Sequence, residues 1–169
     1  MEEYAKRKTP RWQAFDYNKG VYFITLCTQG RRCILSHIVG TGFLDRPQIQ
    51  LTKYGEIAEK YIKQLGDFYD HISIERYVIM PNHIHILLGI TESGQSGTPV
   101  PTRANSAFSK FISTLKRFCN KEYGENIWQA RAYDHIIRNR QDYEEHWRYI
   151  GENPLRWHND LLYAKEQQK

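Results

Sequence analysis

Two histidines one residue apart, His83 and His85, are the first residues of this sequence whose type and spacing indicate chemistry. They begin the run HIHILLGI, whose apolar residues are typical of a buried β-strand. Alternate side chains of a strand share a face, so both imidazoles should point the same way. Two such histidines form part of a divalent-metal site, or they are half-buried polar residues held by hydrogen bonds. A metal site requires at least one further ligand.

A tyrosine and an asparagine near the end of the sequence form a second pair. Tyr149 and Asn153 are four residues apart in a segment with a helical pattern, so their side chains share one helix face. Next to this face, we predict a buried stripe of Tyr143, Trp147 and Ile150. If the helix packs near the two histidines, a phenol nucleophile and a third metal ligand meet the imidazoles. A lone tyrosine is more often a packing residue, so the two pairs support this prediction only together.

The order of the predicted elements indicates an α+β fold of the ferredoxin-like, split β-α-β type. Strands are predicted in GVYFITLCTQGRRCIL, HISIERYVIM, HIHILLGI and ARAYDHIIRN, and a hairpin or loop in SHIVGTGFLDRPQIQL. One helix should begin at a Thr52 cap and end at Gly66, and a second should bury a stripe from Phe108 to Cys119. The third helix, in QDYEEHWRYIGENP, should end at Pro154. We therefore expect an antiparallel sheet with helices on one face, plus this C-terminal helix.

The length of 169 residues and the absence of an internal repeat predict one domain over residues 1–169. Residues 1–16 form a basic N-terminal arm in this interpretation. Residues 91–104, rich in Gly, Ser, Thr and Pro, form a flexible loop. The chain ends soon after the third helix, so no additional C-terminal domain is expected.

The composition excludes several classes of protein. A hydrophobic content of 40% with 14% aromatic residues is typical of a globular chain and not of a disordered one. No apolar run is long enough to span a bilayer, and the charged N-terminus is unlike a signal peptide. Three cysteines without a CxxC pair fit a reducing compartment and offer no thiolate zinc site. We expect a cytoplasmic protein without membrane contact.

The basic residues form two groups that predict a polyanionic partner. The net charge is +5, and the excess is concentrated in an N-terminal group and on one side of the second helix. Such groups position phosphates; a solvated face and a frayed terminus are the alternatives. The candidate DNA-binding residues are Lys6, Arg7, Lys8, Arg11, Lys110, Arg117 and Lys121.

Two segments together resemble a known family. MPNHIHILLGI, followed by IWQARAYDHIIRNRQDYEEHWRYIGENPLRW, is similar to the single-tyrosine HUH transposases, and most to their REP-associated tyrosine transposase branch. The resemblance runs from about Tyr17 to Leu162. The HUH pattern, two histidines around a hydrophobic residue, falls on His83-Ile84-His85. The tyrosine element of the family, of the form YIxxNP, falls on residues 149–154.

The resemblance implies a metal-dependent endonuclease and strand transferase acting on single-stranded DNA near hairpins. Tyr149 would be the catalytic nucleophile, giving a 5′-phosphotyrosine and a free 3′-OH. His83, His85 and Asn153 would hold Mg²⁺ or Mn²⁺, a metal that acts as a Lewis acid on phosphate. The partner would be single-stranded or hairpin DNA of the bacterial nucleoid, bound by a monomer or a homodimer.

Two other functions remain open from the residues alone. One is a non-catalytic, ferredoxin-like module that binds nucleic acid and has structural histidines. The other is a metal-dependent phosphodiesterase that uses water, which needs the metal ligands but not Tyr149. The roles of His135 and His146 are also open. His135 is a neighbour of the site, a DNA contact or a plain strand residue, and His146 lies one helical turn before Tyr149, within reach of the site.

Overall fold

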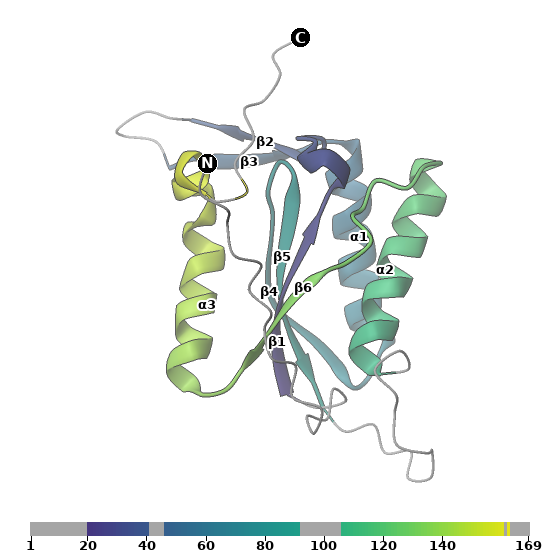
Figure 1. Ribbon diagram of the computed structural model, residues 1–169, viewed down its shortest axis with the longest axis vertical. Helices are drawn as coiled ribbons and strands as arrows, with labels where there is room; N and C mark the ends of the chain where they lie inside the picture. The colour runs from purple at the N-terminus through teal and green to yellow at the C-terminus, as the bar shows by residue number, and fades with distance from the viewer. Residues whose placement is uncertain (1–19, 41–45, 92–105, 161, 163–169) are drawn as a thin grey trace, which may run out of the picture.

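A computed structural model describes residues 20–40, 46–91, 106–160 and 162 (Figure 1). The predicted basic arm at residues 1–16 lies outside the described residues, and so does the predicted loop except for Thr91. The four candidate DNA-binding residues of the arm are therefore not placed. In the part of the chain that is described, no helix has both the length and the apolar character needed to cross a membrane.

The core of the molecule is a four-stranded antiparallel sheet with the strand order β4-β5-β1-β6. Its strands are β1 (Gly20–Cys27), β4 (Ile72–Ile79), β5 (His83–Ile90) and β6 (Tyr133–Ile137). A short 3₁₀ turn (Gln29–Arg31) follows β1. The segment predicted as a hairpin or loop is a separate two-stranded sheet of β2 (Ser36–Val39) and β3 (Gln48–Leu51). The predicted α+β, ferredoxin-like arrangement is confirmed.

Three helices cover the two faces of the sheet (Figure 1). Helices α1 (Lys53–Phe68) and α2 (Ala107–Tyr123) lie together on one face, and α3 (Arg140–Glu152) lies on the other. The predicted cap is confirmed, because Thr52 accepts a hydrogen bond from the Gly55 N–H. The predicted end at Gly66 is wrong, because α1 continues to Phe68. Gly66 lies inside the helix and packs closely on Ile74: a Cβ at this position would lie 2.8 Å from Ile74 Cγ1.

Strand β5 is buried on both faces, which explains its nearly continuous apolar sequence. Ile84, Ile86 and Leu88 pack into the main core, which includes residues of α1 and α2. Leu87 belongs to a smaller cluster on the α3 side of the sheet. By strand alternation, His83 and His85 share the face of Leu87 and point toward α3.

Helix α3 is held on the second face of the sheet by a small apolar cluster. Ile150 is only 1% exposed, and Trp157, in the 3₁₀ segment Asn153–Asn159 that follows α3, is 3% exposed. Both belong to one cluster with Phe23 of β1 and Leu87 of β5. The helical conformation continues through Asn153, whose φ and ψ are −55° and −42°, so Pro154 changes the helix type and does not stop the turn.

The predicted buried stripe of α3 is only partly correct. Ile150 is buried and Tyr143 is half-buried, but Trp147 is 39% exposed. The apolar cluster that holds α3 on the sheet includes Ile150 and Tyr143 but not Trp147. Trp147 lies outside this contact, where its ring packs against the Arg76 guanidinium of β4 at 4.7 Å.

Replacing Ile150 by alanine should weaken the docking of α3. The lost apolar contacts and the resulting cavity should lower the free energy of unfolding by about 3 kcal/mol. Leu155→Ala, at a position that is 58% exposed, is the control and should change it by less than about 0.5 kcal/mol. Urea unfolding followed by circular dichroism measures both values. Equal effects of the two substitutions would contradict this account of how α3 is held.

Candidate metal centre

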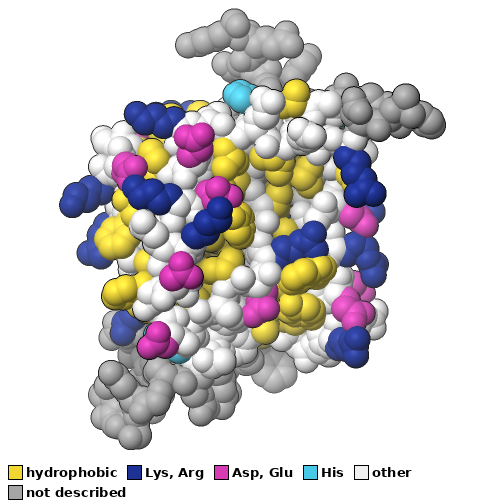
Figure 2. All heavy atoms as spheres, turned by 180° about the vertical axis from the view of Figure 1, so that it is seen from behind, with side chains coloured by type: hydrophobic (Ala, Val, Ile, Leu, Met, Phe, Trp, Pro, Cys, Tyr) yellow, Lys and Arg dark blue, Asp and Glu magenta, His cyan; other side chains and the backbone are white. Residues whose placement is uncertain are grey.

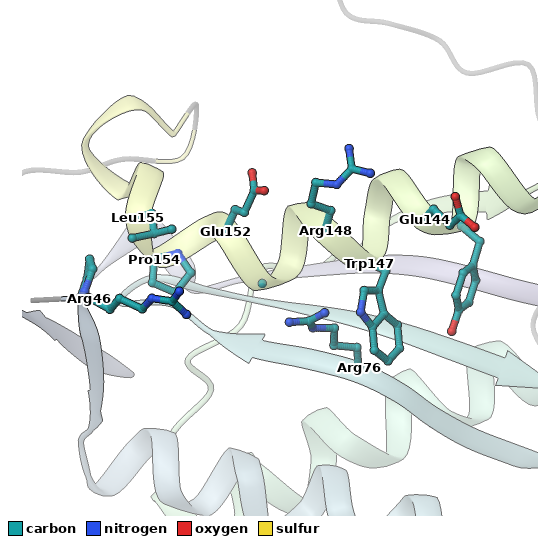
Figure 3. Close-up of a pocket in the computed structure, with 11 residues that line it drawn as sticks. Arg46, Arg76, Glu144, Trp147, Arg148, Glu152, Pro154 and Leu155 are labelled. Atoms are coloured by element: carbon teal, nitrogen blue, oxygen red, sulfur yellow. The ribbon is translucent and has the colours of Figure 1, made fainter.

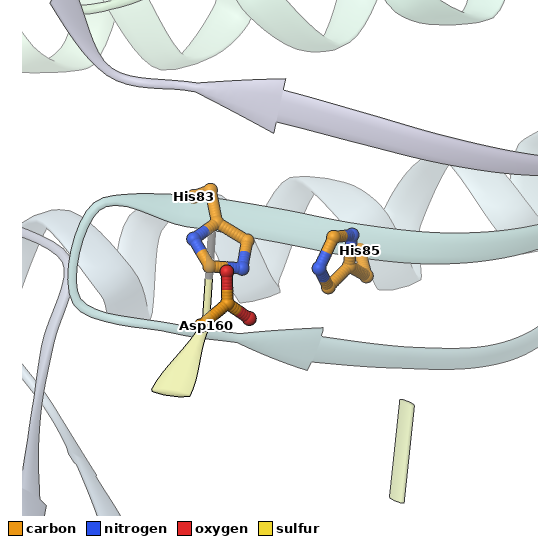
Figure 4. Close-up of side chains that lie close together, drawn as sticks. All are labelled: His83, His85 and Asp160. Carbon is orange, nitrogen blue, oxygen red and sulfur yellow. The ribbon is translucent and has the colours of Figure 1, made fainter. Parts of the chain in front are cut away.

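The two histidines of β5 lie side by side in the protein interior. The centroids of their rings are 4.5 Å apart, and His83 and His85 are 0% and 2% exposed. His85 also stacks on Phe23 of the neighbouring strand at 4.9 Å. The expectation that strand alternation brings both imidazoles to one face therefore holds in the structure (Figure 4).

Hydrogen bonds to the Nδ1 atoms fix the orientation of both rings. His83 Nδ1 lies 2.8 Å from Asn82 Oδ1, and His85 Nδ1 lies 2.8 Å from Thr25 Oγ1. An amide oxygen only accepts, so His83 Nδ1 carries the proton and donates. Asn82 is itself held, because its Nδ2 donates to the Leu162 carbonyl at 2.8 Å. In the neutral His83 ring, Nε2 is therefore left with a lone pair and no hydrogen.

Burial keeps both imidazoles neutral at physiological pH. Desolvation lowers the pKa of His83 from 6.5 to about 4, although the Asp160 carboxylate partly opposes this. Desolvation, together with repulsion from His83, also lowers the pKa of His85 well below its usual value. Neutral imidazoles are the form that binds metal ions.

Three buried polar atoms at this place make no hydrogen bond. In the described part of the chain, four buried side-chain nitrogen or oxygen atoms have none; three of them are His83 Nε2, His85 Nε2 and Asn153 Oδ1. Asn153 is 1% exposed and close enough to His83 to affect its pKa. An unpaired buried acceptor costs roughly 1–3 kcal/mol. Two of the three, His83 Nε2 and Asn153 Oδ1, are acceptors, and buried acceptors that lie together form a suitable site for a cation.

Asp160 is a residue of this site that the sequence analysis missed. One of its carboxylate oxygens and one nitrogen of each histidine all lie within 4.8 Å of one another (Figure 4). Its Oδ2 accepts from Asn153 Nδ2 at 2.9 Å, and its Oδ1 accepts from the Leu162 N–H at 2.7 Å. The set expected from the sequence contained no carboxylate. Asp160 belongs to none of the quoted motifs, and only the 3₁₀ segment after α3 brings it back to β5.

The proposed donors fit a divalent cation of the Mn²⁺ type. Two imidazole nitrogens, one amide oxygen and one carboxylate oxygen are available. Carboxylate and amide oxygens suit Mg²⁺ and Mn²⁺, whereas imidazole favours metals later in the first transition row. A mixed set of this kind therefore favours Mn²⁺ over Mg²⁺, which prefers oxygen ligands.

Tyr149 lies at the edge of the same site. Its ring contacts His85 and Phe23, with centroids 5.3 and 5.9 Å away, and its hydroxyl lies 3.4 Å from Asp160 Oδ2. Partial burial, and then the Asp160 charge, raises the pKa of the Tyr149 phenol to about 12. Tyr149 is still 39% exposed, so a substrate from solvent can reach its hydroxyl. A partly exposed phenol thus lies beside a carboxylate and two buried imidazoles.

The candidate DNA-binding residues of α2 do not lie near this site. Lys110, Arg117 and Lys121 are exposed on α2, which covers the face of the sheet opposite to α3 (Figure 1). The sheet therefore separates them from Tyr149. Whether they bind DNA stays a prediction, but they cannot contact a phosphate held at the histidines.

His135 and His146 form a second group with Asp142. His135 Nε2 and His146 Nδ1 both lie 3.0 Å from the Asp142 carboxylate, and the two rings stack at 4.7 Å. Burial raises the pKa of Asp142, but hydrogen bonds from the Arg138 N–H and from His135 outweigh this effect and lower the pKa. The described interactions satisfy this group internally. It differs in this respect from the unpaired atoms of His83, His85 and Asn153.

Comparison with known proteins finds similar chains and similar solved structures. No protein-family model matches the chain. An uncharacterized protein of Haemophilus influenzae is 30% identical over 175 residues, which cover 94% of this chain and 93% of that protein. The REP-associated tyrosine transposase of Escherichia coli is 29% identical over 111 residues, or 66% of this chain. That match spans only 60% of the Escherichia coli protein.

A solved structure of a REP-associated tyrosine transposase bound to a REP hairpin has the same fold. Its TM-score is 0.62 and its sequence identity is 24%, with 86% of this chain and 73% of that chain aligned. This similarity supports the α+β fold assigned to the chain.

The depressed pKa values predict an acid-sensitive fold in metal-free buffer. Between pH 6.5 and 4, the unfolded chain binds a proton on His83 that the folded chain does not, so stability falls as pH falls. From pH 7 to pH 5, His83 alone should account for a loss of about 2 kcal/mol. Urea unfolding in EDTA measures it. The loss of unfolding free energy should be smaller in His83→Gln. It should persist in His158→Gln, a control at an exposed position. An unchanged loss in His83→Gln would contradict the assignment to His83.

Proposed function

The chain is homologous to the REP-associated tyrosine transposases, and on this premise we propose that it is a transposase that cleaves and rejoins single-stranded DNA. The relative bound to a REP hairpin suggests hairpin DNA as the partner. In our proposal the reaction depends on a divalent metal, and cleavage next to a hairpin leaves a 5′-phosphotyrosine on Tyr149. The observation that carries the proposal is the group of buried, unpaired nitrogen and oxygen atoms of His83, His85 and Asn153 next to Tyr149, whose ring contacts that of His85.

The proposed reaction exchanges one phosphoester bond for another. The Tyr149 oxygen attacks the scissile phosphorus and forms a new P–O bond. The bond from phosphorus to the 3′-oxygen breaks, and that oxygen leaves as a 3′-OH after taking up a proton. A phenol is a better leaving group than an aliphatic alcohol, so the covalent step is reversible and the strand can be rejoined. A divalent cation held at the site would act as a Lewis acid on the phosphate.

The residues around Tyr149 have separate tasks in this mechanism. The phenol is protonated at neutral pH, because its pKa is raised to about 12. Asp160 Oδ2, at 3.4 Å from the hydroxyl, is placed to accept the phenolic proton as attack begins. Asn153 fixes this carboxylate through its 2.9 Å hydrogen bond. Asn82 and Thr25 hold the histidine rings in orientation and so preserve the positions of both Nε2 atoms.

Tyr149→Phe should abolish covalent attachment to DNA while the fold survives, because only the hydroxyl is lost. The substrate is a pool of hairpin oligonucleotides with randomised unpaired flanks, incubated with the protein and Mn²⁺. Adducts are counted as protein bands that resist denaturation and carry labelled DNA. Tyr133→Phe, at an exposed position of β6, is the control and should retain the adduct.

Three other outcomes would overturn the assignment. Loss of the adduct in Tyr143→Phe but not in Tyr149→Phe would move the nucleophile to Tyr143. Metal-dependent cleavage without any adduct would indicate a phosphodiesterase that uses water. Hairpin binding without cleavage by the unaltered protein would indicate a non-catalytic nucleic-acid-binding module.

Metal binding should raise the thermal unfolding temperature, since a ligand that binds only the folded state stabilises it. We expect a rise with Mn²⁺ and a smaller one with Mg²⁺. His85→Gln should remove the rise, and Asp160→Asn should weaken metal affinity by about 10- to 100-fold. His135→Ala, in the second histidine group, should leave the rise unchanged. A rise that is lost in His135→Ala and kept in His85→Gln would place the metal at His135 instead.

A further inference from the structure

An open groove of about 820 Å³ lies on the flank of α3 that faces away from Tyr149 (Figure 3). Its walls are α3 and the segment that follows it on one side, and β4 with the two residues before β3 on the other. Figure 3 shows Arg76 and Trp147 side by side between α3 and the sheet, with Arg46 near Pro154. Neither the candidate metal centre nor the nucleophile uses these residues.

Two local features of the backbone place the Arg76 side chain in the groove. The pairing of β4 with β5 shifts between Ile74 and Arg76, as expected for a β-bulge. A bulge redirects the side chains that follow it, and here it turns Arg76 toward α3. Gly151 of α3 leaves the space that the guanidinium occupies, because a Cβ there would lie 2.3 Å from Arg76 Nη2.

An aromatic surface adjoins the guanidinium. The Arg76 guanidinium lies 4.7 Å from the centre of the Trp147 ring, and Trp147 stacks on Tyr143 at 5.9 Å. Trp147 is 39% exposed, which is unusual for an indole that no function requires. The Trp147 ring, with Arg76 and Tyr143 packed against it, is therefore only partly open to solvent, and the open part lies beside a positive charge.

The positive charge of the groove is not neutralised by its own glutamates. Among the described residues, Arg46, Arg76 and Arg148 form no ion pair with a carboxylate. The two glutamates that line the groove are each paired with another arginine one helical turn away: Glu144 with Arg140 at 2.7 Å and Glu152 with Arg156 at 2.6 Å. On the face seen in Figure 2, Lys and Arg side chains lie next to exposed hydrophobic ones. The groove thus combines unpaired guanidinium groups with an exposed aromatic ring.

Guanidinium groups bind phosphates, and an exposed aromatic ring packs against an unpaired base. This combination is suited to single-stranded nucleic acid and not to a fully paired duplex. The groove also reaches Pro154 and Leu155, which directly follow Asn153 of the candidate metal centre. A strand leaving Tyr149 can therefore pass around the C-terminal end of α3 and enter it.

We propose that this groove binds a single-stranded DNA segment continuous with the strand that Tyr149 cleaves, with one unpaired base packed against the exposed part of the Trp147 ring and phosphates on Arg46 and Arg76. The proposal rests on the function proposed above and adds a substrate-binding site to it. The groove holds the strand on one flank of α3, while the hydroxyl of Tyr149 meets it on the other. Strand position, and thus the choice of the cleaved bond, depends on this contact.

The test measures DNA affinity without cleavage, using Tyr149→Phe protein in EDTA. The probes are a pool of hairpins with randomised unpaired flanks and the same hairpins without flanks. Trp147→Ala should weaken binding of the flanked pool by about tenfold, and Trp147→Phe should retain most of the affinity. Gly151→Ala should also weaken it, because the new Cβ displaces the Arg76 guanidinium. Lys53→Ala, which removes an exposed charge on α1 across the sheet, is the control and should have little effect.

Binding of the hairpins without flanks should be unchanged in all these proteins. In addition, flanks that contain 5-iododeoxyuridine should crosslink, on irradiation, to the peptide that carries Trp147. Unaltered affinity of Trp147→Ala for the flanked pool would overturn the proposal, as would an equal loss for hairpins with and without flanks. Because Tyr149 does not act in this assay, a failed adduct test together with a positive result here would reject only the proposed reaction. A positive adduct test with a negative result here would reject only the groove.

Discussion

The packing of α3 against the second face of the sheet is the contact on which the rest of the site depends. Ile150 and Trp157 enter an apolar cluster with Phe23 and Leu87, and this contact covers the imidazoles of β5. Covering them removes water from His83 and His85 and lowers their pKa values. The same contact brings Tyr149 to the edge of the histidine pair. An apolar interaction therefore determines both the protonation state of the histidines and the position of the phenol.

A connected set of hydrogen bonds converts this packing into a defined arrangement of donor atoms. Asn82 links His83 to the carbonyl of Leu162, and Asp160 accepts from both Asn153 and the Leu162 N–H. The turn between β4 and β5 and the segment after α3 thus hold each other at the histidines. Each bond satisfies a buried polar group, yet His83 Nε2, His85 Nε2 and Asn153 Oδ1 are left unpaired. The network holds these three atoms in place without giving them a hydrogen bond, and this arrangement suits the metal ligands of the proposed function.

The two flanks of helix α3 carry different side chains and contact different parts of the sheet. On one flank, Tyr149 and the residue after the helix, Asn153, face the histidines and Asp160. On the other, Trp147 and Gly151 face Arg76 of the bulged edge strand. The residues between them, such as Ile150, bind the helix to the sheet. In the proposed function this division lets one helix carry the nucleophile and also position the strand that it attacks.

The sequence by itself determined the features that depend on local periodicity. The alternation of β5 predicted that His83 and His85 share a face, and the i, i+4 spacing predicted the same for Tyr149 and Asn153. The order of strands and helices predicted the α+β fold. Only the tertiary structure placed Asp160 at the histidines and Trp147 outside the buried stripe, and only it separated the basic face of α2 from Tyr149 by the width of the sheet. Periodicity describes which side chains of one element point together. It contains no information on how wide the contact between two elements is, or on where the chain returns after a turn, because both are decided by packing between residues distant in sequence.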